Sequence, residues 1–134
     1  MLEFSDLSRP RIDLSMYDEN NSVMPIDRVH IMDEDTFEQF VTEWLYGCKK
    51  SQYEVVQRIG GAGDKGRDVI AKNKDGSIDV YQCKHYISAL SRSQFYVELG
   101  KLCYYTYKKE IPIPRCYYII ASNDIGPSLE TLIN

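Results

Sequence analysis

The sequence lacks the residue patterns that build a zinc site. It contains four cysteines and two histidines among 134 residues, and no two of the cysteines are spaced as Cys-x-x-Cys. Zinc sites in small domains are usually made from such pairs, so a zinc-stabilised fold is disfavoured. A single domain with one active unit is the expected organisation at this length.

Long apolar runs are also missing. No stretch approaches the roughly 18 apolar residues that a membrane-spanning helix needs, and the chain does not open with a charged segment followed by an apolar one. We therefore expect no membrane partner. Free thiols in a chain without a leader predict a cytoplasmic location.

The chain has no overall excess of positive charge, which would be the usual mark of a nucleic-acid partner. Its formal net charge is −4, but the charge is unevenly distributed. Residues 1–46 carry 11 acidic residues and 3 arginines, whereas residues 47–134 carry 13 lysines and arginines and 9 acidic residues. The acidic overall balance therefore conceals a basic segment, with a net charge of +4, that could face phosphates.

The first quarter of the chain predicts little regular structure. Residues 1–33 are polar, carry Pro10 and Pro25, and show no sustained period, so we expect an acidic arm with a short extended segment at residues 26–32. Residues 34–134 are expected to form the folded domain. A final helix opening at Pro127 would end after one or two turns at Asn134, which predicts a fragment of a longer protein.

The domain shows alternating helix and strand patterns. Apolar residues at helical spacing follow Asp35 and Glu38, which form a potential capping box, and Gly47 marks the expected helix end. The later elements are strands at 53–59, 68–72 and 78–85, a helix at 91–109, a buried strand at 116–121 and the final helix. The order α-β-β-β-α-β-α, with an Asp75-Gly76 hairpin, predicts an α/β fold with a mixed central sheet flanked by helices.

A glycine-rich loop joins the first two strands. Gly61-x-Gly63-x-x-Gly66 matches a dinucleotide-binding fingerprint, but the following residues Asp68 to Ala71 are typical of a strand, whereas that fingerprint opens a helix. A tight connection between strands explains the glycines without any ligand. Neither interpretation explains Asp68, an acid at the entrance of a strand.

Asp68, Gln82 and Lys84 are the main candidate site residues. Residues two apart in a strand share a face, so Gln82 and Lys84 should project together, away from Cys83. Pairing across the Asp75-Gly76 turn places Asp68 opposite Cys83, flanked by Gln82 and Lys84. A carboxylate and a lysine at one corner of a sheet indicate a metal-dependent phosphodiesterase site. A simple ion pair across the hairpin is an equally open alternative.

Glu38 could supply a second acidic group over the sheet, although its place in the capping box gives it an ordinary structural role. Lys65 and Arg67, on and next to the glycine loop, are candidates for phosphate contacts. His85, beside Lys84, could also contact a nucleic-acid substrate.

Taken together, these residues resemble a known family. Phe37-Glu38 in an amphipathic helix, the run from Gly61 to Val69 and Gln82-Cys83-Lys84 are similar to the motifs of the Mrr-like branch of the PD-(D/E)xK, or restriction-endonuclease-like, nucleases. The resemblance covers roughly residues 34–130 and implies a three-layer α/β/α core. It also implies that Asp68, Glu38, Gln82 and the Cys83 carbonyl hold Mg²⁺ or Mn²⁺, and that Lys84 is the catalytic lysine. Gln82 would stand where the family usually has an acid, and as a neutral residue it would be a weaker ligand.

The resemblance further implies an endonuclease that cuts double-stranded DNA with Asp68, Gln82, Lys84 and Glu38 as catalytic residues. Such a domain would serve as the effector of a bacterial restriction or antiviral defence protein, as a homo-oligomer or fused to a sensor or oligomerisation module. Two alternatives stay open: a nuclease-fold domain that has lost catalysis and binds nucleic acid or assembles, and an enzyme that cleaves RNA.

Overall fold

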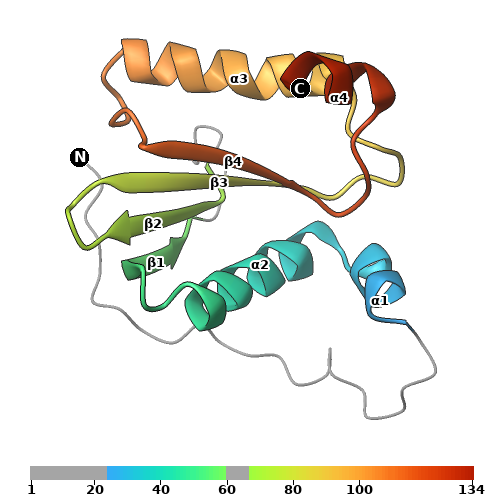
Figure 1. Ribbon diagram of the computed structural model, residues 1–134, viewed down its shortest axis with the longest axis horizontal. Helices are drawn as coiled ribbons and strands as arrows, with labels where there is room; N and C mark the ends of the chain where they lie inside the picture. Colours follow the sequence, from blue (N-terminus) through green and yellow to red (C-terminus); the bar gives the residue numbers. More distant parts are fainter. Residues whose placement is uncertain (1–23, 60–66) are drawn as a thin grey trace.

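A computed structural model describes residues 24–59 and 67–134, which form a four-stranded sheet between two layers of helices (Figure 1). Most of the expected arm and the glycine loop at residues 60–66 lie outside the described residues. The elements are α1 (Pro25–Ile31), α2 (Glu34–Cys48), β1 (Tyr53–Arg58), β2 (Val69–Asn73), β3 (Ile78–Lys84), α3 (Arg92–Tyr107), β4 (Cys116–Ala121) and α4 (Pro127–Ile133).

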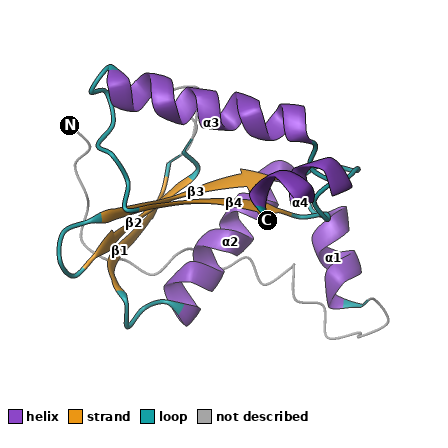
Figure 2. Ribbon diagram, turned by 45° about the horizontal axis from the view of Figure 1, so that its top comes forward, coloured by secondary structure: helices purple, strands orange, loops and turns teal. Residues whose placement is uncertain are grey.

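The sheet has the predicted mixed topology. Its strands lie in the order β1-β2-β3-β4, the first three pair antiparallel, and β4 returns through α3 to pair parallel with β3. Helices α1 and α2 lie on one side of the sheet and α3 and α4 on the other (Figures 1 and 2). The predicted three-layer α/β/α arrangement is therefore confirmed.

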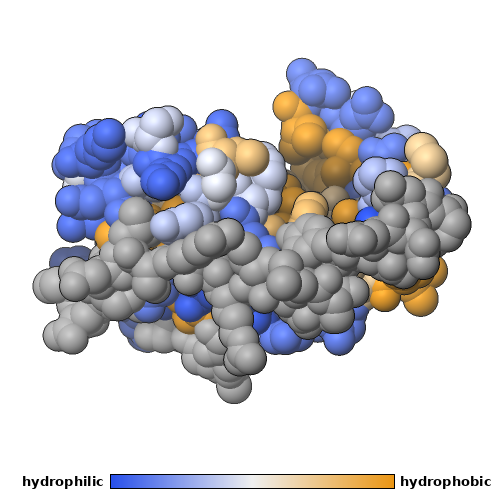
Figure 3. Space-filling model, turned by 90° about the horizontal axis from the view of Figure 1, so that it is seen from below, coloured by the Kyte–Doolittle hydropathy of each residue, from blue (hydrophilic) through white to orange (hydrophobic). Residues whose placement is uncertain are grey.

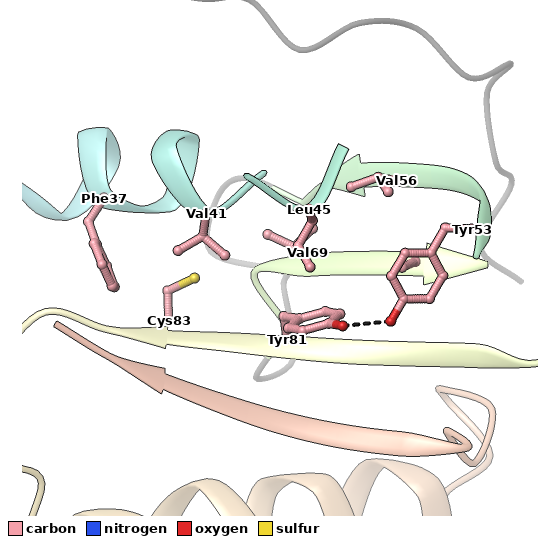
Figure 4. Close-up of a cluster of buried hydrophobic side chains, with 9 residues drawn as sticks. Phe37, Val41, Leu45, Tyr53, Val56, Val69, Tyr81 and Cys83 are labelled. Atoms are coloured by element: carbon pink, nitrogen blue, oxygen red, sulfur yellow. Dashed lines mark hydrogen bonds between the residues drawn. The ribbon is translucent and has the colours of Figure 1, made fainter. Parts of the chain in front are cut away.

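The main hydrophobic core lies between α2 and the sheet. Phe37, Val41 and Leu45 recur every four residues on α2, so they form one stripe, and all three are buried. They pack against side chains from all three antiparallel strands, including Val69 and Cys83 (Figure 4). This packing fixes α2, and with it the start of that helix, over the end of β3.

Helix α1 replaces the extended segment predicted at residues 26–32, so that prediction was wrong. Pro25 occupies the first turn, Asp27 follows it there, and Arg28 and His30 lie in the last turn, an arrangement that complements the helix dipole. No residue of α1 is buried, and Ile26 and Ile31 are exposed. In the space-filling view from this side, hydrophobic surface gathers toward the right-hand part of the molecule (Figure 3).

The N-cap of helix α2 lies two residues before the predicted cap. The Asp33 side chain accepts a hydrogen bond from the Thr36 N–H at 2.7 Å, so Asp33 is the N-cap and the predicted Asp35–Glu38 capping box is wrong. The helix also continues through Gly47 to Cys48. Glu38 is thereby released from a capping role.

The β2–β3 hairpin forms where it was predicted but with a different register. Val69 pairs with Tyr81 and Lys72 with Ile78, one residue away from the predicted pairing of Asp68 with Cys83. The reason is the turn: the Asn73 N–H donates to the Ser77 carbonyl, so three residues rather than two form the connection. Gly76 has φ of 88°, as this type of turn requires. The pairing is thus shifted by one residue, which moves Asp68 from opposite Cys83 toward Gln82.

The outer strand and α3 are less buried than expected. The prediction of a buried strand at residues 116–121 was wrong, because β4 is the edge strand of the described sheet and Tyr118 is 40% exposed. Within α3, which is described throughout, the one buried residue is Glu98. No helix in the described part of the chain is long and apolar enough to cross a bilayer.

Candidate active site

A polar pocket of about 220 Å³ opens at the end of β3. Its walls come from the first turns of α2, from the residue before β2, from the end of β3 and from α3. The lining residues are Glu34, Phe37, Glu38, Asp68, Gln82, Cys83, Lys84, His85, Tyr86 and Lys101. Residues separated by more than 60 positions in the sequence thus meet in one hollow, and six of the eight predicted site residues line it.

Asp68 is fixed by its neighbours on both sides. Its N–H donates to the Tyr81 carbonyl at 3.0 Å, and its own carbonyl accepts from the Ile59 N–H at 2.8 Å. Its Oδ2 accepts from the Cys83 N–H at 2.7 Å, and the residue is only 4% exposed. A buried carboxylate that accepts a main-chain hydrogen bond, on a backbone that is itself bonded on both sides, is a rigid group with a defined position.

Lys84 ends β3 and forms a buried ion pair. Its Nζ lies 2.7 Å from Oε1 of Glu98 on α3, and 14% of the lysine side chain is exposed. Burial alone would lower the pKa of Lys84, but the hydrogen bond and negative charge of Glu98 outweigh burial and raise that pKa above its ordinary value. The charge of Asp68 acts in the same direction. Lys84 is therefore a fixed positive charge at neutral pH.

Gln82 and Cys83 point to opposite faces, as the alternation predicted. The Cys83 side chain projects from β3 toward α2 and belongs to the core, where burial raises the pKa of its thiol (Figure 4). Gln82 is 5% exposed, and its Oε1 is buried without a hydrogen-bond partner among the described residues. A buried carbonyl oxygen without a donor is costly, so this atom is available to accept a hydrogen bond or to bind a cation.

Glu38 lines the pocket but is already engaged. Arg58 of β1 donates to Glu38 Oε2 from both Nε, at 3.1 Å, and one terminal nitrogen, at 2.7 Å. The same guanidinium reaches Asp35 at 2.6 Å. Glu38 thus lines the same pocket as Asp68, with one carboxylate oxygen held by the Arg58 guanidinium.

The three residues predicted to contact nucleic acid do not lie together in the described structure. His85 lines the pocket, where its ring stacks on Phe37 at 5.2 Å between centroids. Lys65 lies outside the described residues. Arg67 is 6% exposed and lines a separate small hollow beside Ile111, so the structure does not bring it to the Asp68 pocket.

The donor atoms at the pocket fit a hard divalent cation. Among residues 24–59 and 67–134, no group of three or more His, Cys, Asp or Glu side chains is arranged to hold a metal. Any ligand set here must therefore include neutral oxygens. The unpartnered Gln82 Oε1, from a residue that lines the same pocket as Asp68, could supply one, and Mg²⁺ accepts such oxygens together with water.

Sequence reasoning missed Glu98 as a site residue. It lies three residues after Phe95 and four before Leu102, on the side of the helix where apolar residues were expected. A charged residue within an apolar stripe was the available signal. Only the packing of α3 over the end of β3 reveals its partner, Lys84.

Comparison with known proteins gives one match. The family model Mrr_cat, described as a restriction endonuclease, matches residues 29–97, just over half of the chain. This span contains α2, the β-meander, all of the pocket except Lys101, and the first turns of α3. No curated protein and no solved structure matches the chain.

Proposed function

Since the chain belongs to the Mrr-type restriction endonuclease family, we propose that it is a metal-dependent endonuclease that hydrolyses phosphodiester bonds of double-stranded DNA. One observation carries the proposal. Asp68, Gln82 and Lys84, delivered by two adjacent strands, line a single polar pocket. A simple ion pair across the hairpin is a weaker explanation, because Lys84 pairs with Glu98 on α3.

The residues that would hold the cation are Asp68 and Gln82, with the Cys83 carbonyl and Glu38 as additional oxygen donors. Such an ion, Mg²⁺ or Mn²⁺, supplies Lewis-acid polarisation of the scissile phosphate and activation of water. Asp68 is suited to this role because two main-chain hydrogen bonds and the bond from the Cys83 N–H fix its position. Glu38 would contribute through the oxygen that Arg58 does not hold.

Lys84 would act on the phosphate and on the attacking water. Its ammonium has three donors, of which Glu98 engages one, so the others can orient water and stabilise the negative charge that develops on phosphate oxygens. Because the pKa of Lys84 is raised, the group serves as a charge and hydrogen-bond donor rather than as a base. Lys101 and His85 at the same pocket, together with Lys65, are the proposed contacts to the DNA backbone.

A plasmid-nicking assay tests this proposal. Wild type, Asp68→Ala and Lys84→Ala are incubated with supercoiled DNA in Mg²⁺, in Mn²⁺ and in EDTA, with Glu130→Gln on exposed α4 as the control variant. We expect wild type and the control to cut in both metals and not in EDTA. Lys84→Ala should be slower by roughly 100- to 1,000-fold. Equal cutting by all four proteins would refute the proposal, and labelled RNA in parallel reactions tests the RNA alternative.

A second function is favoured by the Glu38–Arg58 contact and by the neutral residue at position 82. Both reduce the negative charge available for a metal, which suits a nuclease-fold domain that binds nucleic acid or assembles without cutting. That domain would retain DNA binding in a gel-shift assay while all variants fail to cut in either metal. The proposed place of the enzyme in bacterial restriction or antiviral defence, as an oligomer or fused to a regulatory module, rests on the family alone.

A further inference from the structure

Glu98 is an unusual choice for the buried face of a helix. It is 4% exposed and is the one residue of α3 that is buried, while neighbouring apolar residues such as Val97 and Leu99 are exposed. A buried carboxylate is costly unless it is paired, and apolar replacements of buried ion pairs are often neutral or stabilising. Packing of α3 onto the sheet therefore does not explain why this position carries an acid.

The pairing of Glu98 with Lys84 does explain it. Lysine has a flexible four-carbon stem and a compact charge, so nothing in the side chain itself fixes where the ammonium lies. The 2.7 Å contact with Glu98 Oε1 fixes it, at the end of β3 where the pocket opens.

Lys101 adds a second cation to the same carboxylate oxygen. Its Nζ lies 3.3 Å from Glu98 Oε1, and 46% of its side chain is exposed. Lys101 also lines the pocket. One carboxylate therefore holds two lysines side by side, which would otherwise repel each other, and the three groups together retain one positive charge facing a site for phosphate.

We propose that Glu98 is a positioning residue that holds the Lys84 ammonium for phosphodiester hydrolysis. The inference rests on the proposed nuclease function and adds to it a residue on the far helical layer. Glu98 does not line the pocket itself, so it acts through Lys84 rather than on the substrate.

The test separates activity from stability. Glu98→Leu removes every acceptor while suiting an apolar stripe, and Glu98→Gln removes the charge but keeps one acceptor. We expect both variants to fold but to be less stable than wild type to urea, because each leaves the buried Lys84 ammonium without its charged partner. We also expect kcat to fall by roughly 10- to 100-fold in Glu98→Leu, and by less in Glu98→Gln, with KM for DNA unchanged. Glu130→Gln, a matched charge removal on α4, should change neither quantity.

A double-variant comparison identifies the route of action. In the Lys84→Ala background, Glu98→Leu should cause no further loss of kcat, because the group that it positions is already absent. A further loss there, or unchanged kcat in Glu98→Leu with Lys84 present, would overturn the inference. Failure of both Glu98 variants to fold would also overturn it, since the role would then be structural.

A labelling experiment distinguishes failure of this inference from failure of the nuclease proposal. The 134-residue chain is treated with acetic anhydride, and modification of each lysine is followed by mass spectrometry. Lys84 should be protected in wild type and lose that protection in Glu98→Leu, whether or not the protein cuts DNA. If Lys84 reacts equally in both proteins, Glu98 does not hold it, even if cleavage is observed.

Discussion

The Cys83 N–H donates a hydrogen bond of 2.7 Å to Oδ2 of Asp68. This bond joins the residue before β2 to the third strand, immediately beside Lys84. The main chain of one candidate residue thus fixes the side chain of another. The carboxylate consequently has a structural role as well as its proposed catalytic role, and the two can be separated by substitution.

Asp68→Ala is expected to destabilise the fold, whereas Asp68→Asn is not. Alanine leaves the Cys83 N–H without its acceptor in a buried position, which costs about 1–3 kcal/mol of unfolding free energy. The asparagine oxygen can still accept that bond, so the unfolding free energy of Asp68→Asn should stay within about 1 kcal/mol of the wild-type value. Urea unfolding measures both values. Equal stability of the two variants would show that this bond contributes nothing.

Gln82→Glu is expected to make stability depend on a divalent cation. A second carboxylate near Asp68 in a buried site should lower the unfolding free energy by on the order of 2 kcal/mol in EDTA. A cation bound between them should restore that loss, so Mg²⁺ should raise the melting temperature more than it does for wild type.

The matched control for this prediction is Gln57→Glu. Gln57 Oε1 is also buried without a partner among the described residues, but Gln57 does not line the pocket. Its variant should lose stability equally with and without Mg²⁺. A Mg²⁺ response of the same size in both variants would contradict a metal site at Gln82.

Alanine at two glycines should have opposite effects on stability. At Gly76, with φ of 88°, an alanine side chain would meet no atom within 4 Å but would force a left-handed backbone, which costs roughly 1–2 kcal/mol. At Gly47, inside α2 and equally uncrowded, alanine should stabilise by about 0.5–1 kcal/mol. Thermal unfolding compares them. Because the Gly76 turn sets the strand register of Asp68, DNA cleavage should fall in Gly76→Ala and stay at the wild-type rate in Gly47→Ala.

Acid stability is expected to depend on Asp79 and Arg115. Burial would raise the pKa of Asp79, but hydrogen bonds from Arg115 and Tyr53 outweigh it and hold that pKa below 3.8. A lowered pKa stabilises the fold above pH 3.8, and this contribution is lost as the pH falls through the folded-state value. Arg115→Ala should therefore move acid unfolding, followed by circular dichroism, to higher pH.

The control for the acid-unfolding experiment is Glu54→Gln. Glu54 forms an exposed ion pair with Lys72 at 3.6 Å, and such pairs contribute little. Its acid-unfolding midpoint should therefore match that of wild type. A shift as large as that of Arg115→Ala would mean that general charge, rather than the buried Asp79 pair, sets acid stability.

The sequence was sufficient to predict the sheet and the meeting of Asp68, Gln82 and Lys84, because strand alternation and a hairpin turn are local signals. It did not predict the exact register. The connection closed by Asn73 and Ser77 has three residues, ending at Gly76, rather than two, and the extra residue shifts the strand pairing by one position. It placed Glu38 near the site, with a cap as its alternative role, but not in the grip of Arg58, because the reach of Arg58 from β1 is visible only after folding. Glu98 was missed for the same reason: its partner lies on another element.

Cleavage of an end-labelled DNA duplex by Asp68→Asn, at saturating protein and in Mg²⁺, tests the central claim most directly. This variant keeps an acceptor for the Cys83 N–H and removes the negative charge, and its urea unfolding measured beside wild type shows that it is folded. We predict that wild type cuts and that Asp68→Asn is slower by more than roughly 100-fold, beyond the loss typical of outer-shell residues. Cutting at the wild-type rate by Asp68→Asn would contradict the account.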